Sequence, residues 1–194
     1  FLSMKIGVVH PNLMLKGGGE YVTAEIIQAL RENNDIELIS FQDPDVDELN
    51  SFFDTDLEED DFSVRKPAFS SFLMKRTQGS FFKLRNGLIK NFARRKKDDY
   101  DLLISGLNEA DFGEKGFQYV HFPDSVNEQY FHETGEVTMD LSKGNDSLFY
   151  NTYLKVAEMF KQDRLSVEKN ITVCNSTFTK SVHEQVFDNE AEVI

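Results

Sequence analysis

Residues 4–41 read MKIGVVHPNLMLKGGGEYVTAEIIQALRENNDIELISF, and this stretch decides the expected fold. Its opening, Met4–His10, is short, apolar and rich in β-branched residues, as buried parallel strands are. Three glycines follow, and apolar residues then recur at helical spacing from Tyr21 to Arg31. Because Ile36–Phe41 has the pattern of a second strand, the stretch predicts a strand, helix, strand unit of the usual length.

The rest of the chain continues this alternation. Further strands are expected at 101–105, 117–122, 171–174 and from 191 to the end, and helices near 80–97, 146–166 and 177–187. The pattern predicts an α/β fold, a Rossmann-like parallel sheet with helices on both faces. The polar stretch Pro123–Asp146 is long for a simple connection, so we expect a functional loop or an insertion there.

Length and composition fit one soluble domain. The 194 residues are 40% hydrophobic and include 18 Phe, which is enough for one sizeable core. We interpret residues 1–3 as vector-derived and place the native start at Met4, so the domain covers residues 4–194. No signal peptide and no run of roughly 18 apolar residues is present, which predicts a cytoplasmic protein. The closing residues 192–194 look like a strand opening, so we expect a cut at a domain boundary.

Metal and disulfide chemistry have no basis in the sequence. Cys174 is the one cysteine and lies in an apolar run, so we interpret it as a small buried hydrophobe. The chain has no His/Cys/Asp cluster with metal-ligand spacing, so we expect no metal site and no cofactor.

Charge is divided unevenly along the chain. The net charge is −13, yet Arg65 to Lys97 contains eleven basic residues and no acidic one. The remaining residues hold ten basic and 34 acidic side chains. The acidic cluster at 43–61 predicts a solvated loop without a catalytic pair. We expect no nucleic-acid partner, because no known nucleic-acid-binding module accompanies the basic stretch.

A glycine loop joins the first strand to its helix. Gly17, Gly18 and Gly19 let backbone amides approach an anion closely, and the following helix start adds a partial positive charge. The dinucleotide fingerprint does not fit, since Val22 stands where its third glycine belongs. A plainer alternative is a tight turn in which Glu20 caps the helix.

Three further segments share with this loop a resemblance to a known family. The loop and helix GGGEYVTAEIIQAL (17–30) resemble the start of family-4 retaining glycosyltransferases, which have two facing Rossmann-like domains in the GT-B architecture. YVHFPD (119–124) is similar to a segment of the mannosyltransferases that extend lipid-linked oligosaccharides. CNSTFTKSV (174–182) and AEVI (191–194) resemble the last strands and helix of the family's N-terminal domain.

The resemblance implies roles for several residues. The amides of Gly18 and Gly19 would contact the donor diphosphate or a phosphate of the acceptor, and His121 would face the reacting sugar as the catalytic residue. Asn175 and Ser176 would line the same region, although capping the next helix explains them equally well. Lys180 would either reach a phosphate or be an ordinary surface lysine. The family's donor-binding glutamates belong to a C-terminal domain absent from this chain, which predicts that the chain alone is inactive.

Residues 80–97 combine apolar and basic side chains in a predicted amphipathic helix. Such helices dock on anionic membrane surfaces, which would bring a lipid-linked acceptor to the enzyme. The alternative is a core-facing helix with a charged outer face. The expected docking residues are Phe81, Phe82, Lys83, Arg85, Leu88, Arg94 and Arg95.

The sequence therefore predicts the acceptor-side domain of a hexosyltransferase-type glycosyltransferase, peripheral on the cytoplasmic face of the membrane. By the resemblance, it transfers a sugar with retention from a nucleotide-diphosphate donor to a lipid-linked or polysaccharide acceptor. The alternatives are a non-catalytic Rossmann-like module that binds a nucleotide or phosphorylated metabolite and, third, a dehydrogenase-type cofactor domain.

Overall fold

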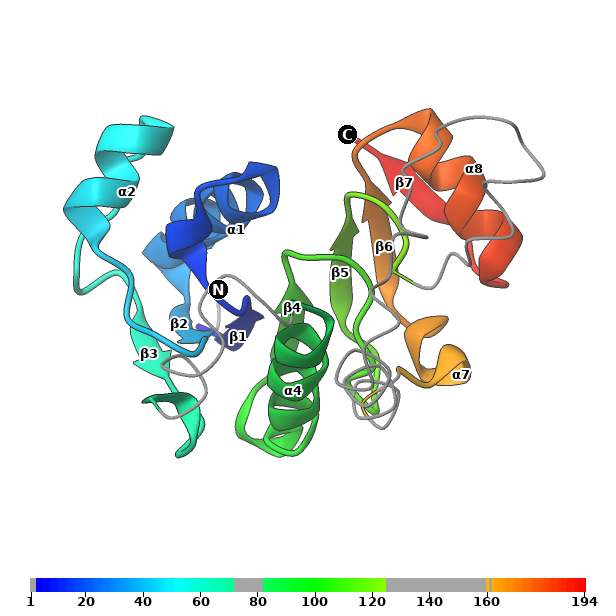
Figure 1. Cartoon of the computed structure of the whole chain (residues 1–194), viewed down its shortest axis with the longest axis horizontal. Coiled ribbons are helices and arrows are strands. Elements are labelled where there is room, and N and C mark those ends of the chain that lie inside the picture. The colour runs from blue at the N-terminus through cyan, green and yellow to red at the C-terminus, as the bar shows by residue number, and fades with distance from the viewer. Residues whose placement is uncertain (1–2, 72–81, 125–159, 161) are drawn as a thin grey trace, which may run out of the picture.

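Parallel strands form the centre of the molecule. The computed structural model describes residues 3–71, 82–124, 160 and 162–194. In this part of the chain, seven strands form one sheet in the order β3-β2-β1-β4-β5-β6-β7, and every neighbouring pair is parallel (Figure 1). The strands are β1 (Lys5–Val9), β2 (Asp35–Ile39), β3 (Ser63–Arg65), β4 (Leu102–Ser105), β5 (Phe117–Val120), β6 (Ile171–Cys174) and β7 (Ala191–Val193).

Helices connect these strands and confirm the predicted α/β fold. The α-helices are α1 (Gly18–Leu30), α2 (Val46–Phe53), α4 (Phe82–Arg94), α7 (Arg164–Val167) and α8 (Thr177–Val186). Short 3-10 turns are η1 (Leu13–Leu15), η2 (Arg31–Asn33) and η3 (Lys97–Asp99).

Two apolar clusters show that helices cover both faces of the sheet. Val8 of β1 packs in one cluster with Ile27 of α1 and Leu49 of α2. The next residue, Val9, packs in the other cluster with Ile89 of α4. Successive side chains of a strand point to opposite faces, so α1 and α2 lie on one face and α4 on the other.

A smaller cluster closes the β7 side of the sheet. It contains Val120, Cys174 and Ala191, each buried. Burial raises the pKa of the Cys174 thiol to about 11, as expected for an inert side chain. The interpretation of Cys174 as a buried hydrophobe is confirmed.

The prediction of a solvated loop across 43–61 is wrong over Val46–Phe53, because these residues form α2. Asp45 caps this helix by accepting a hydrogen bond from the Glu48 amide at 2.9 Å. Leu49, fully buried, holds the helix to the sheet. The many carboxylates hid an eight-residue helix with one buried apolar position.

Other expected elements differ at their ends. The strand expected at 117–122 stops at Val120, so His121 lies just beyond the carboxyl end of β5. The helix expected at 146–166 falls largely outside the described residues, and so does the stretch after Asp124; α7 is the helix seen at 164–167. Sequence reasoning also missed β3, which has only three residues.

Candidate functional site

The strand order points to one place on the sheet for a ligand. From β1 the chain moves outward to β2 and β3 and then returns to β4 on the other side of β1. Ligands of such sheets bind beyond the carboxyl ends of the strands where the order reverses. His10, Gly106 and His121 directly follow β1, β4 and β5 at that edge.

The glycine loop forms the α1 side of this edge. Helix α1 begins at Gly18, and the carboxylate of Glu20 accepts a hydrogen bond from the Gly17 amide at 2.9 Å. This is the capping contact that the plainer interpretation predicted. The first amides of a helix have no intrahelical acceptor, so those of Gly18 and Gly19 are suited to an anion. Capping by Glu20 and anion binding are therefore compatible.

Gly19 lies against the predicted catalytic histidine. A Cβ atom added at Gly19 would stand 2.8 Å from Leu107 Cδ1 and 3.5 Å from His121 Nε2, whereas one added at Gly18 would meet no atom within 4 Å. The structure thus brings the glycine loop and His121 together, although 102 positions separate Gly19 from His121 in the sequence.

Half-buried His121 has a defined orientation. Its Nε2 lies 3.2 Å from the carbonyl oxygen of Gly106, which can only accept, so Nε2 carries the proton. Nδ1 then keeps its lone pair. Burial lowers the pKa of His121, while the Gly106 carbonyl and the charge of Glu20 act in the opposite direction. His121 is therefore a neutral hydrogen-bonding group at neutral pH.

A second histidine, His10, lies fully buried at the end of β1. Its Nδ1 accepts a hydrogen bond from the Asn12 amide at 3.2 Å, which places the proton on Nε2, 3.5 Å from Glu20 Oε1. Burial lowers the pKa of His10 to about 3, and the charges of His121 and Lys90 act in the same direction. His10 is therefore a neutral imidazole whose Nε2 lies beside Glu20 and makes no hydrogen bond within the described part of the chain. Its position at a strand end was the available sequence signal.

Behind His121 lies a polar cluster that sequence reasoning missed, in which buried side chains meet Asp124, whose own side chain is 40% exposed. Lys90, 2% exposed, points its Nζ to Asp124 Oδ2 at 3.4 Å. Glu109, 1% exposed, accepts a hydrogen bond from the Asp124 amide at 2.9 Å. Burial, and next the charge of Asp124, raise the pKa of Glu109 to about 7. Asn86 and Asn108 complete the cluster with hydrogen bonds to Asp124.

The start of α8 borders the same edge. Ser176 caps this helix by accepting a hydrogen bond from the Thr179 amide at 3.1 Å, and Asn175 Oδ1 accepts one from the Thr179 hydroxyl at 2.7 Å. That hydroxyl also lies 3.2 Å from the His121 carbonyl oxygen. Lys180 Nζ lies 3.6 Å from Glu184 Oε1 on the same helix. These residues thus act in capping and surface pairing, the plainer interpretation, and their contact with a ligand stays a prediction.

The expected membrane-docking residues do not share one surface. Arg85 is 5% exposed, so its inclusion in a docking surface is wrong, because α4 turns it inward. Leu88 is half-buried and packs on the apolar cluster beneath α4. The exposed ones are Phe82, Lys83, Arg94 and Arg95, and Arg94 forms an ion pair with buried Asp111; Phe81 lies outside the described residues. Across the described part of the chain, no helix is long and apolar enough to span a membrane.

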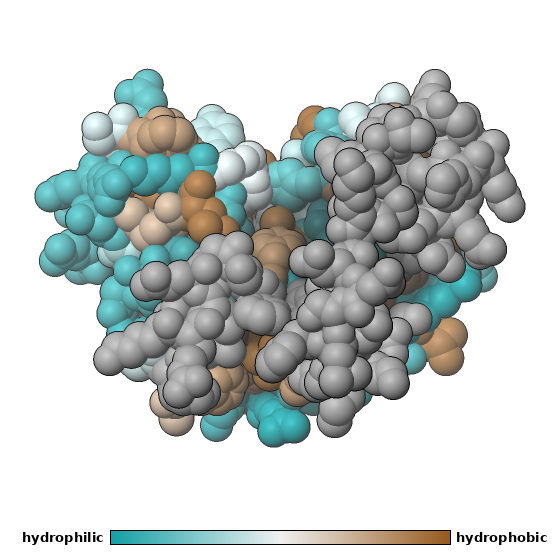
Figure 2. All heavy atoms as spheres, in the orientation of Figure 1, coloured by the Kyte–Doolittle hydropathy of each residue, from teal (hydrophilic) through white to brown (hydrophobic). Residues whose placement is uncertain are grey.

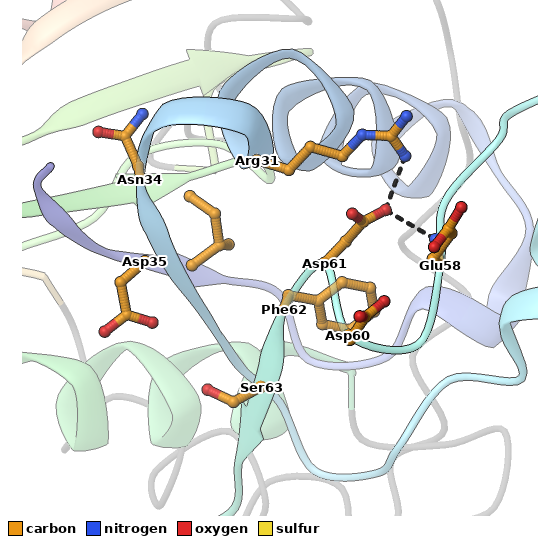
Figure 3. A pocket seen from close by; sticks show the side chains of 9 residues that line it. Arg31, Asn34, Asp35, Glu58, Asp60, Asp61, Phe62 and Ser63 are labelled. Carbon is orange, nitrogen blue, oxygen red and sulfur yellow. Dashed lines mark hydrogen bonds and ion pairs between the residues drawn. The ribbon is translucent and has the colours of Figure 1, made fainter.

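An open pocket of about 490 Å³ lies at the opposite edge of the sheet (Figure 3). It borders the starting ends of β2 and β3, with Asp35 and Ser63 in its lining. Arg31 in its lining forms ion pairs with Asp61 at 2.6 Å and with Asp56 at 3.0 Å. The lining carboxylates Asp35, Glu58, Asp60 and Asp61 would repel a phosphate, so we assign the pocket no part in anion binding.

The side of the molecule formed by α1, α2 and β3 carries both polar and apolar surface (Figure 2). On the face shown in Figure 2, mostly hydrophilic residues cover the side formed by α1, α2 and β3, with apolar patches among them. Exposed Tyr21 of α1 and Phe52 of α2 both contact half-buried Phe53 through their rings.

Among the described residues, no group of three or more His, Cys, Asp or Glu side chains could hold a metal ion.

Comparison with solved structures gave weak similarities, two of which are described here. No family model and no curated protein matches the chain. HepE from Anabaena, solved in complex with UDP and glucose, has a TM-score of 0.44 and 16% identity over 98% of this chain and 44% of that one. TcCGT1, solved in complex with UDP, has a TM-score of 0.35 and 15% identity over 97% of this chain and 50% of that one. The chain thus spans half or less of both proteins.

Proposed function

We propose that this chain is the acceptor-side domain of a nucleotide-sugar glycosyltransferase. One observation supports it above the others: the amide end of α1 lies against His121 at the edge where the strand order reverses. The resemblance of the segments at 17–30 and 119–124 to family-4 retaining glycosyltransferases agrees with this arrangement. The glycine loop holds a phosphate of the donor or of the acceptor.

The proposed reaction moves a sugar from a nucleotide-diphosphate donor to a hydroxyl of a lipid-linked or polymeric saccharide, with retention at the anomeric carbon. As the bond to the diphosphate breaks, negative charge grows on its oxygens. Preorganised amides at the start of α1 stabilise that charge without having to reorient. His121 faces the reacting sugar as a neutral group, with the Nδ1 lone pair available to accept a hydrogen bond.

Activity of the whole enzyme requires a second domain in this proposal. In it the glycine loop supplies amides for the diphosphate, and recognition of the nucleotide base is assigned to the other domain. We expect no sugar transfer by the 194-residue chain alone, and transfer by it would contradict this division of roles. The alternative, a non-catalytic binding module, shares the anion site and differs by lacking transfer even when the remainder of the protein is present.

Gly18→Ala tests the anion site with little strain on the protein. A methyl group there enters open space, so the fold should be unchanged, whereas a bound diphosphate would meet it. We expect the affinity for UDP and for pyrophosphate to fall by about tenfold, equivalent to about 1.4 kcal/mol. Titrations followed by amide NMR would measure both the affinity and the location of binding.

Ser63→Ala, in the pocket at the opposite edge, is the matched control and should bind as the wild type does. Both ligands should shift the amides of Gly18, Gly19 and His121 and leave that of Ser63 unchanged. Shifts confined to residues around Ser63, or equal affinity in Gly18→Ala and wild type, would contradict the proposed site.

A further inference from the structure

The loop after β4 turns back at Asn108 to meet the end of β5. Asn108 has a φ of 56°, in the left-handed region that Asn adopts more readily than most residues. Its amide donates to the Tyr119 carbonyl at 2.9 Å, and the Ser105 hydroxyl donates to its carbonyl at 2.8 Å. The turn therefore presents the Asn108 side chain, 8% exposed, to the residues that follow β5.

The carboxamide of Asn108 binds both the backbone and the side chain of that segment. Its Oδ1 accepts hydrogen bonds from the amides of His121 at 2.9 Å and Phe122 at 3.2 Å. Its Nδ2 donates to Asp124 Oδ1 at 2.8 Å. Only a group that accepts and donates at once can make these three bonds, and Asn does so at the φ that the turn requires.

Asp124 is in turn fixed to α4. Its Oδ2 accepts from Asn86 Nδ2 at 3.0 Å and lies 3.4 Å from Nζ of buried Lys90. A buried ammonium group without a partner is costly, so this contact strongly favours one position for Asp124. The segment 121–124 is thus held at its start by Asn108 and at its end by α4.

We propose that Asn108 is a positioning residue for His121. By holding the His121 amide, its carboxamide keeps the imidazole against the Gly106 carbonyl, with the proton on Nε2 and the ring beside Gly19. The use of His121 in sugar transfer rests on the proposed function. The positioning itself does not, because it is a property of the protein without ligand.

The test reads the His121 ring directly by nitrogen NMR of the full chain labelled at histidine. In the wild type, the Nε2-protonated tautomer should dominate at neutral pH. Asn108→Gly keeps the permitted backbone angle and removes the carboxamide, so the ring nitrogen shifts of His121 should move toward those of a solvent-exposed imidazole, in which both tautomers are populated. Asn108→Asp keeps an oxygen for the two backbone amides, so the His121 signal should return toward that of the wild type even though contact with Asp124 becomes repulsive.

Asn50 provides a control with the same chemistry elsewhere. Its Oδ1 accepts from the Leu57 amide at 3.0 Å and the Thr55 hydroxyl at 2.8 Å, and its Nδ2 donates to the Leu57 carbonyl. Asn50→Gly should destabilise the fold and leave the His121 tautomer unchanged. A folded Asn108→Gly variant with the wild-type nitrogen shifts of His121 would overturn the inference, as would equal changes in Asn50→Gly. The UDP affinity of Gly18→Ala tests only the proposed function and does not test whether Asn108 positions His121.

Discussion

Glu109 holds a carboxyl group where water has almost no access. Burial raises its pKa from 4.5 to about 7, with the charge of Asp124 as the next contribution. The folded state therefore binds this proton more tightly than the unfolded state does. Stability from this group is fully present below about pH 4.5 and is lost as pH rises toward 7, a loss of about 3 kcal/mol at most.

Glu109→Gln should remove that dependence. The amide oxygen of Gln can still accept the Asp124 amide hydrogen bond, and the side chain stays neutral at every pH. Urea unfolding at pH 5 and pH 8 should show the variant gaining stability over the wild type as pH rises. His10 acts in the opposite direction in both proteins, because its pKa is lowered, so its contribution cancels.

Glu192→Gln, on an exposed residue of β7, controls for the loss of one carboxylate. Parallel changes of stability with pH in Glu109→Gln and wild type would contradict the assignment of the raised pKa to Glu109.

At the residue scale, sequence reasoning named those candidate site residues that belong to recognisable local patterns. The glycine loop lies between a strand and a helix, and His121 follows a short apolar run, so both could be predicted. For His10 the sequence offered only its position at a strand end, and Glu109 could not be predicted, because its environment comes from segments far apart in the chain. Lys90, which contributes to the surroundings of both, lies in the stretch 80–97, for which only an amphipathic helix was predicted.

At the scale of elements, α1 approaches the end of β4 so closely that one position accepts only glycine. A Cβ atom at Gly106 would lie 2.1 Å from Thr23 Oγ1 and 3.0 Å from Thr23 Cβ. Thr23 is fully buried and its hydroxyl donates to the Gly19 carbonyl at 2.7 Å, so it cannot move freely. This contact sets the distance between α1, which carries the glycine loop, and the strand next to β1.

Gly106→Ala should therefore destabilise the protein by about 1–3 kcal/mol through overpacking. Adding Thr23→Ala removes the nearest atom, so the double variant should recover part of the loss despite the missing hydroxyl bond. Chemical denaturation of the wild type, both single variants and the double variant gives the coupling energy. Strictly additive losses would show that the two side chains do not compete for the same space.

The elements themselves were predictable to different degrees. The apolar runs of β1, β4 and β6 and the periodicity of α1 come from many buried positions, and the structure confirms them. Helix α2 buries one residue fully among several carboxylates, so its charge dominated the pattern. In α4 the helix was predicted but not its orientation, because Asn86 and Lys90 face inward toward Asp124.

At the scale of the whole molecule, charge is separated along the chain. Every charged residue in the stretch Arg65–Lys97 is basic, whereas the rest of the chain is strongly acidic. A net charge of −13 should repel an anionic bilayer, so docking requires the basic stretch to face it. Lys83 and Arg95 are exposed on or next to α4 and are suited to such contact, while Lys90 and Arg85 are buried.

We propose peripheral membrane association through this stretch and test it with a charge-matched pair of variants. Lys83→Glu combined with Arg95→Glu should abolish sedimentation with anionic vesicles, because each exposed basic residue contributes about 1 kcal/mol near the surface and each reversal adds repulsion. Lys115→Glu combined with Lys169→Glu changes the net charge equally at exposed positions outside the basic stretch, so binding should be retained. Neutral vesicles should bind none of the proteins, and higher salt should weaken wild-type binding. Equal loss of binding in both double variants would show that net charge alone governs the association. No binding by the wild type would show that the basic stretch only covers the core, and it would favour a soluble acceptor.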